Sequence, residues 1–149
     1  MSATISSINY CPVKSVSFQT IEKCEIKKDI GIINDRIFAF AKDLDQEQAK
    51  LFEKSPDDRK GKWNKVLTLK NSPVLNKYNF IFKNEKLTLT LIDKEIFTID
   101  TNQSEECEAL SNKISELESS LRQPITLMKN YEFPFFDTSI SNKVNFVNS

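Results

Sequence analysis

Alternation of apolar and polar residues with a period of two is the feature that most constrains how this chain can fold. The run "KLTLTLI" (86–92) places three leucines on one face and threonines on the other, as in a strand with one buried face. Similar runs at 78–83 and 95–99 flank it, separated by short polar turns at 84–85 and 93–94. We therefore predict a meander of three hairpin-linked strands over this region.

Shorter runs of the same kind predict further strands at 4–10, 23–28, 36–42, 65–69 and 124–129. The run at 23–28 alternates as a half-buried strand does, whereas the run at 36–42, "RIFAFAK", is apolar on both faces and should be covered on both sides. About seven short strands in one chain are typical of a mainly β protein. We expect a small antiparallel β-barrel or a strongly curled sheet.

One long helix is expected near the C-terminal end, at about 102–121. Asn102 and Glu105 have the spacing of a capping box. After them an apolar stripe recurs at intervals of three and four residues, which should pack on the barrel; it consists of Cys107, Leu110, Ile114, Leu117 and Leu121.

Residues 43–62 interrupt the strand pattern and are predicted to be an inserted short helix followed by a charged loop. Its basic residues should be solvated, as charged loops usually are; they are Lys54, Arg59, Lys60 and Lys62.

Composition excludes several classes of function. The chain has no histidine and only two glycines among 149 residues, so neither a histidine-based triad nor a glycine-rich nucleotide loop can be built. Its three cysteines are widely spaced and form no metal or redox motif. The net charge of zero gives no attraction to nucleic acid or to a membrane surface, and no secretion signal or membrane-spanning run is present. We expect a cytoplasmic protein with neither a nucleic-acid nor a membrane partner.

Two short motifs could bind an anion. "CPVKS" (11–15) presents Lys14 and Ser15 after a proline-fixed turn, and "NDR" (34–36) presents Arg36 before a buried strand. The alternative is that Lys14 is solvated and that Arg36 pairs with Asp35 or another nearby carboxylate. In a simple meander the two motifs would lie at opposite edges of the sheet, so a bend between residues 15 and 30 would be needed to join them.

The order of these motifs resembles a known family. "YCPVKS", then "IGIINDRIFAFAKD", then "KVLTLKNSPVLNKYNFIF" is similar to the N-terminal β-barrel domain of MOSC proteins, the relatives of molybdenum-cofactor sulfurase and of the mitochondrial amidoxime-reducing component. The likeness covers nearly the whole chain. Cys11 stands where the family pattern has a tyrosine and Lys70 where it has an arginine, and the 43–62 insertion departs from the pattern.

The resemblance implies a role for particular residues. Lys14, Ser15 and Arg36 would hold the phosphate of the molybdenum cofactor (molybdopterin), and the "DTS" stretch of Asp137, Thr138 and Ser139 would line the same cofactor. Residues 1–130 would then form the MOSC N-terminal β-barrel domain, and 131–149 would be a linker or the start of a truncated MOSC domain.

The same resemblance places the molybdenum ligand in that missing C-terminal domain, which would be the main partner of these residues. We expect no catalytic and no metal-binding residue in this chain. The intact protein would be an oxidoreductase that takes electrons from electron-transfer proteins.

Two other functions stay open. The chain could be a stand-alone β-barrel binding or interaction module that docks a partner through its curled sheet and a C-terminal aromatic cluster, namely Phe133, Phe135, Phe136 and Phe146. It could also have a pyridoxal-phosphate or sulfur-carrier role, although no lysine has a recognisable Schiff-base setting.

Overall fold

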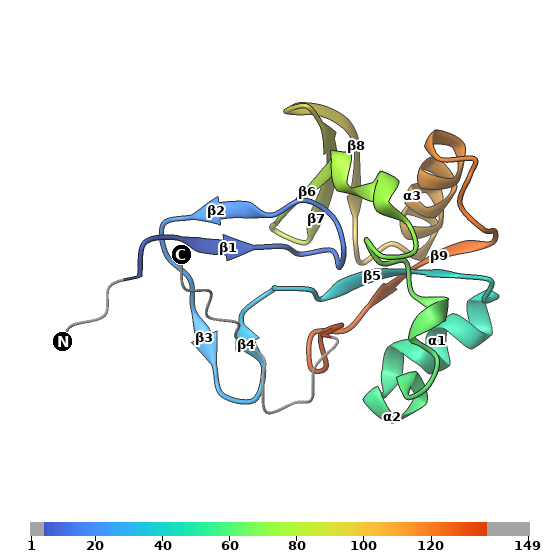
Figure 1. Ribbon diagram of the computed structural model, residues 1–149, viewed down its shortest axis with the longest axis horizontal. Coiled ribbons are helices and arrows are strands. Elements are labelled where there is room, and N and C mark those ends of the chain that lie inside the picture. Colours follow the sequence, from blue (N-terminus) through green and yellow to red (C-terminus); the bar gives the residue numbers. More distant parts are fainter. Residues whose placement is uncertain (1–4, 137–149) are drawn as a thin grey trace.

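A computed structural model describes residues 5–136 of the chain (Figure 1). The strands of this part are β1 (Ile8–Tyr10), β2 (Gln19–Ile21), β3 (Ile26–Lys27), β4 (Gly31–Ile32), β5 (Phe38–Lys42), β6 (Tyr78–Lys83), β7 (Lys86–Leu91), β8 (Lys94–Asp100) and β9 (Ile125–Lys129). Its helices are α1 (Gln46–Lys54), α2 (Pro56–Arg59) and α3 (Ser104–Leu117), with two 3₁₀ helices, η1 (Trp63–Lys65) and η2 (Pro73–Lys77).

The strands of residues 5–136 do not close into a barrel. They form four separate antiparallel ladders, β1–β2, β3–β4, β5–β9 and β6–β7–β8. β5 pairs fully with β9 along one edge, but its other edge makes only isolated bridges with Val13 and Val66. Of the two expected forms, a barrel or a strongly curled sheet, the barrel is therefore wrong, because no continuous ladder of hydrogen bonds runs around residues 5–136. Helices and strands together make a mixed fold.

The meander of β6, β7 and β8 confirms the strongest sequence pattern. Leu87 and Leu89 of β7 are fully buried, as the alternation predicts. The first hairpin turns at Asn84-Glu85, as expected, and the second turns at Ile92-Asp93, one residue earlier than expected. All four turn residues have positive φ, the left-handed geometry that two-residue hairpins require.

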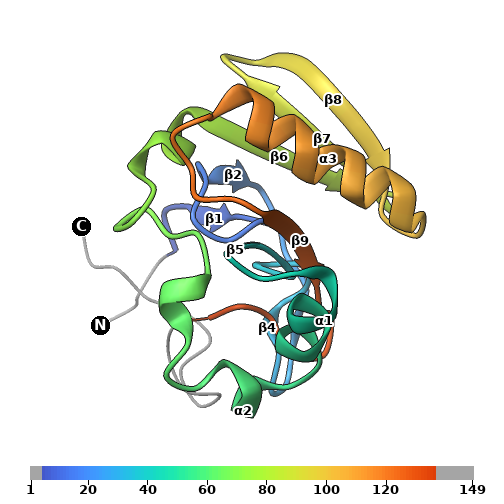
Figure 2. The ribbon, with the colours of Figure 1, turned by 90° about the vertical axis from the view of Figure 1, so that its right-hand side faces the viewer.

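Helix α3 lies across the meander and beside β9 (Figure 2). Leu110 and Ile114 of the predicted stripe are fully buried, so the helix packs through the expected face. The predicted capping box does not form. The N-cap residue is Gln103, without a side-chain cap, and Glu106 instead accepts a hydrogen bond from the backbone N–H of Asp100 at 2.5 Å.

Strand β5 is covered on both faces, which confirms the prediction for 36–42. Phe38 and Phe40 point into the larger core, formed with the meander and α3. Ala39 and Ala41 point into a smaller core that includes Phe52 of α1 and Phe135. Helix α1 contributes to this smaller core and packs beside β9, the strand that pairs with β5.

Three further expectations are corrected. The strand at 23–28 is reduced to the two residues of β3, and Ile26 is 65% exposed rather than half buried. The strand at 65–69 is absent, since only Val66 bridges to β5. The charged part of 43–62 includes the short helix α2, and Arg59 in it is buried rather than solvated. Within residues 5–136, no helix combines the length and apolar character that crossing a membrane requires.

Candidate anion-binding pocket

The first segment of the candidate site is the loop that follows β1. It crosses to the free edge of β5, where the N–H of Lys14 donates to the Phe38 carbonyl at 2.8 Å and the N–H of Phe38 donates to the Pro12 carbonyl at 2.9 Å. Pro12 suits this position because it only has to accept. Ser15 then turns the chain back with φ at 66°. The "PVKS" motif is thus fixed as a short parallel pairing with β5.

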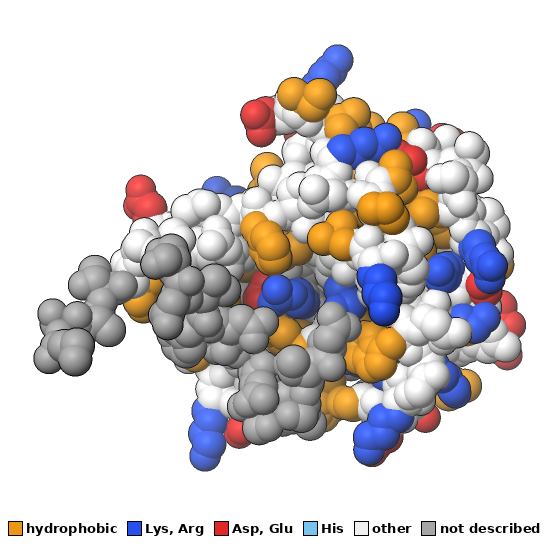
Figure 3. Space-filling view, in the orientation of Figure 1, with side chains coloured by type: hydrophobic (Ala, Val, Ile, Leu, Met, Phe, Trp, Pro, Cys, Tyr) orange, Lys and Arg blue, Asp and Glu red, His pale blue; other side chains and the backbone are white. Residues whose placement is uncertain are grey.

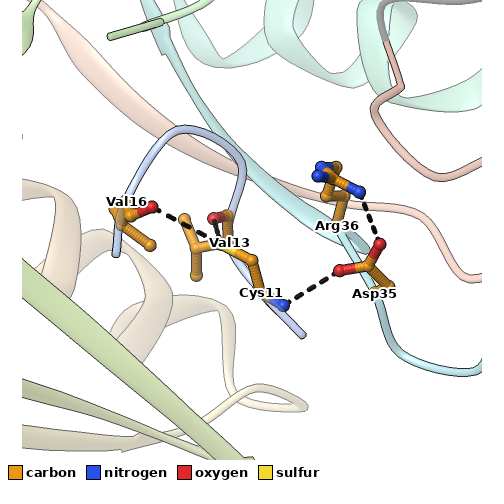
Figure 4. Close-up of polar contacts among 5 residues, drawn as sticks. All are labelled: Cys11, Val13, Val16, Asp35 and Arg36. Atoms are coloured by element: carbon orange, nitrogen blue, oxygen red, sulfur yellow. Dashed lines mark hydrogen bonds and ion pairs between the residues drawn. The ribbon is translucent and has the colours of Figure 1, made fainter. Parts of the chain in front are cut away.

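The second segment is the turn that leads into β5, and it is bonded to the first segment at Cys11 (Figure 4). The N–H of Arg36 donates to the Cys11 carbonyl at 2.7 Å, and the Asp35 carboxylate accepts from the Cys11 N–H at 2.9 Å. The other oxygen of Asp35 pairs with the Arg36 guanidinium at 2.5 Å. Asp35 therefore binds the backbone of the first segment at Cys11 and also orients the Arg36 side chain of the second segment.

The third segment, residues 66–72, lies farther along the same edge of β5. The N–H of Leu67 donates to the Phe40 carbonyl at 2.8 Å. Beyond it, Asn71 braces a tight turn: its side chain accepts from the Thr68 N–H at 2.9 Å and donates to the Val66 carbonyl at 2.9 Å. This turn carries Leu69 and Lys70.

A pocket of about 260 Å³ lies where the three segments meet. Basic side chains gather near the centre of the face shown in Figure 3, with hydrophobic side chains around them. The lining consists of three cations, two hydroxyl residues and four apolar or weakly polar residues, namely Lys14, Arg36, Lys70, Ser15, Thr68, Cys11, Val16, Phe18 and Leu69.

The structure brings together the three described residues that the sequence predicts for the site. Lys14, Ser15 and Arg36 all line the pocket. The two motifs do not lie at opposite edges of a sheet, as they would in a simple meander, because the loop after β1 crosses over to β5. The alternative prediction for Arg36 is also met, since this arginine pairs with Asp35 while lining the pocket. Asp137, Thr138 and Ser139 lie outside the described residues.

Sequence reasoning missed Thr68 and Lys70 as lining residues. The available signal was the place of Lys70, which stands where the resembling family has a basic residue. The apolar pattern of 65–69 predicts a strand, whereas in the structure a turn begins at Leu69.

Burial shapes the chemistry of the pocket. Lys14 is only 3% exposed, and its ammonium lies 5.4 Å from the centre of the Trp63 ring. The Arg36 guanidinium lies 5.8 Å from the Phe18 ring and 5.1 Å from the Phe136 ring. Burial raises the pKa of Asp35, and this is only partly offset by Arg36 and by the Cys11 N–H. Cations held beside aromatic faces in a partly desolvated site attract an anion more strongly than surface lysines do.

Cys11 is the thiol of this pocket, and it is poorly suited to act as a nucleophile. Burial raises its pKa to about 11, and its Sγ donates to the Val13 carbonyl at 2.7 Å. At neutral pH the group is therefore a thiol and not the reactive thiolate. Among residues 5–136, no three Cys, Asp or Glu side chains are grouped so that they could hold a metal ion.

Comparison with known proteins returned no match of any of the three kinds sought: a family model, a curated protein or a solved structure.

Proposed function

We propose that this chain binds the phosphate group of a small-molecule ligand in the pocket at the edge of β5 that does not pair with β9. The observation that carries the proposal is the convergence of Lys14, Ser15 and Arg36 with Thr68 and Lys70 from three separate segments. A guanidinium, two ammonium groups and two hydroxyls are the donors that phosphate oxygens require. In most surface clusters the cations are exposed, whereas here Lys14 is buried and Arg36 is fixed by Asp35.

Backbone conformation supports the same reading. Ser15 and Arg36 have φ of 66° and 53°, in the left-handed region that residues with a side chain rarely adopt. Each costs on the order of 1 kcal/mol; such residues occur at binding sites and also in turns and bends, where the other seven non-glycine residues with positive φ among residues 5–136 lie. Both of these residues are ones whose side chains line the pocket.

The ligand we propose is the molybdenum cofactor, on the strength of the resemblance to the MOSC N-terminal domain. Lys14, Ser15 and Arg36 would hold its pterin phosphate. When bound, the cofactor would supply two-electron redox chemistry to an oxidoreductase, while the residues described here bind and orient its phosphate. The pocket volume suits this division. About 260 Å³ is below the roughly 300–1,000 Å³ of pockets that enclose whole ligands, so it can hold the phosphate and the group next to it but not the whole cofactor.

The experiment that tests phosphate binding is calorimetric titration with inorganic phosphate. Replacing one cation, Arg36→Gln or Lys14→Gln, should weaken binding about ten- to a hundredfold, because a charge-assisted hydrogen bond contributes roughly 1.5–3 kcal/mol. The matched control is Arg122→Gln, since the Arg122 side chain is 78% exposed and lines no part of the pocket. Absence of binding by the wild type, or an equal loss in the control, would reject the proposal.

The cofactor itself needs a separate measurement. The wild-type chain and its Arg36→Gln variant would be purified from molybdenum-replete cells and analysed for pterin by fluorescence after oxidation. We expect pterin with the wild type and much less with the variant. If the wild type binds phosphate but carries no pterin, the phosphate-site proposal stands and the molybdenum cofactor is rejected as the ligand.

The interaction-module hypothesis has less support, because two residues of its aromatic cluster are engaged, while Phe133 is 36% exposed and Phe146 lies outside the described residues. Phe135 is fully buried in the smaller core, and Phe136 lies against Arg36. The interaction-module hypothesis differs from the phosphate-site proposal in predicting that Lys14→Ala and Arg36→Ala leave partner binding unchanged.

A further inference from the structure

Two large hydrophobic side chains line the phosphate pocket while remaining open to solvent. Phe18 is 56% exposed and Leu69 is 39% exposed, and they come from different segments of the site. A pocket for a bare anion needs no such groups, because burying apolar surface against a hydrated ion gains nothing. Their position beside the cations indicates contact with the part of a ligand that is not the phosphate.

Phe18 is held rigidly although its ring is exposed. Both neighbours in the chain are bonded to strand β6: the N–H of Ser17 donates to the Tyr78 carbonyl at 3.0 Å, and the Gln19 side chain donates to the Phe80 carbonyl. The backbone at Phe18 is therefore tethered on both sides. An aromatic ring on a fixed backbone loses little conformational entropy when a ligand packs against it.

Leu69 is presented in a similar way from the opposite segment. It sits within the turn that the Asn71 side chain braces through Thr68 and Val66. The volume of the pocket leaves space for a ligand group as well. At roughly 30 Å³ for each water-sized group, about 260 Å³ holds about nine such groups, which exceeds the five heavy atoms of a phosphate.

We infer that Phe18 and Leu69 are specificity-determining residues, and that the pocket selects phosphate esters that carry a flat ring over esters of a hydrated polyol. The ring would pack against Phe18 and Leu69 while Lys14 and Arg36 hold the phosphate. This inference rests on the proposed phosphate site and adds the class of organic group that the site accepts. Apart from the cations assigned to the phosphate, the lining offers only the hydroxyls of Ser15 and Thr68, which are too few to replace the water around several hydroxyl groups.

The test compares three probes that present a phosphate group: inorganic phosphate, glycerol 3-phosphate and phenyl phosphate. By calorimetry, the wild type should bind phenyl phosphate about tenfold more tightly than glycerol 3-phosphate, the discrimination that one good aromatic contact provides. Phe18→Ala should reduce this ratio to near one, because it should weaken the binding of phenyl phosphate far more than that of inorganic phosphate or glycerol 3-phosphate. Leu69→Ser should reduce the ratio in part.

The control is Ile92→Ala, which removes an exposed apolar side chain from the turn between β7 and β8, away from the pocket. It should keep the wild-type ratio, and circular dichroism should show that each variant is folded. Equal wild-type affinity for the two esters would overturn the inference and leave the phosphate site standing. An equal loss of all three probes in Phe18→Ala would also overturn it, because Phe18 would then act only by supporting Arg36. Failure of every probe to bind the wild type would overturn both proposals.

Discussion

Arg59 shows, at the scale of a single residue, how far an environment can differ from what the surrounding sequence suggests. It lies in a charged stretch, yet it is only 2% exposed. Its guanidinium donates to the carbonyls of Phe52 at 3.0 Å and Glu53 at 2.9 Å in helix α1, and to that of Phe133 at 2.7 Å. It also stacks on the Phe135 ring at 4.1 Å. Arg59 thus joins the inserted helices to the segment that follows β9.

We predict that Arg59→Ala lowers the free energy of unfolding by about 3 kcal/mol or more, since several buried carbonyls lose their donor. Arg59→Lys should recover only part of this loss, because one ammonium cannot reach carbonyls on both segments. Urea denaturation would measure both. Lys60→Ala, at the exposed neighbour, should leave the stability unchanged. If Arg59→Ala were as stable as Lys60→Ala, the joining role would be rejected.

The turn at 68–72 is the element of the site that depends most on a single side chain. Asn71 makes its side-chain bonds to residues of the same segment, so it fixes the turn locally and not through the core. This turn presents Leu69 and Lys70 to the pocket.

We expect Asn71→Ala to destabilise the protein by about 1 kcal/mol, because the bonds it loses are partly exposed and water replaces some of them. Thermal denaturation would show the change. Asn64→Ala, which replaces another exposed asparagine of the same connection, should have no effect. Equal melting temperatures for Asn71→Ala and the wild type would mean that the backbone alone holds the turn.

At the scale of the whole molecule, β5 joins the two cores. Alternate residues of this one strand enter the larger core with the meander and the smaller core with α1. Unfolding of either core displaces β5 and therefore disrupts the packing of the other core. The sharing of a central strand therefore couples the two halves energetically.

This coupling predicts one cooperative unfolding transition. Trp63, the single tryptophan, packs against the smaller core, while far-UV circular dichroism reports on all helices and strands, including the meander and α3 of the larger core. The two probes should give the same urea midpoint. Ile99→Val, in the larger core, should destabilise by about 1 kcal/mol and shift both midpoints together. A shift seen by circular dichroism alone would show that the cores unfold independently.

Features that depend on local periodicity could be predicted from the sequence alone. The meander, the two-faced strand at 36–42, the buried stripe of the C-terminal helix and the strand at 125–129 were all predictable, because each follows from which neighbouring residues are apolar. The candidate residues Lys14, Ser15 and Arg36 were also predictable as residues, from their turn positions and from a family resemblance.

Which strand edges pair, and which residues meet at the pocket, became clear only from the tertiary structure. Whether the sheet closes depends on which strand edges pair, and β5 leaves one edge to two crossing loops rather than to a strand. That choice opens the sheet and also creates the pocket, since it brings Lys14, Arg36 and Lys70 to one place. Edge pairing and the burial of Arg59 are contacts between residues far apart in the chain. No local pattern encodes them, because their free energy exists only after the segments have met.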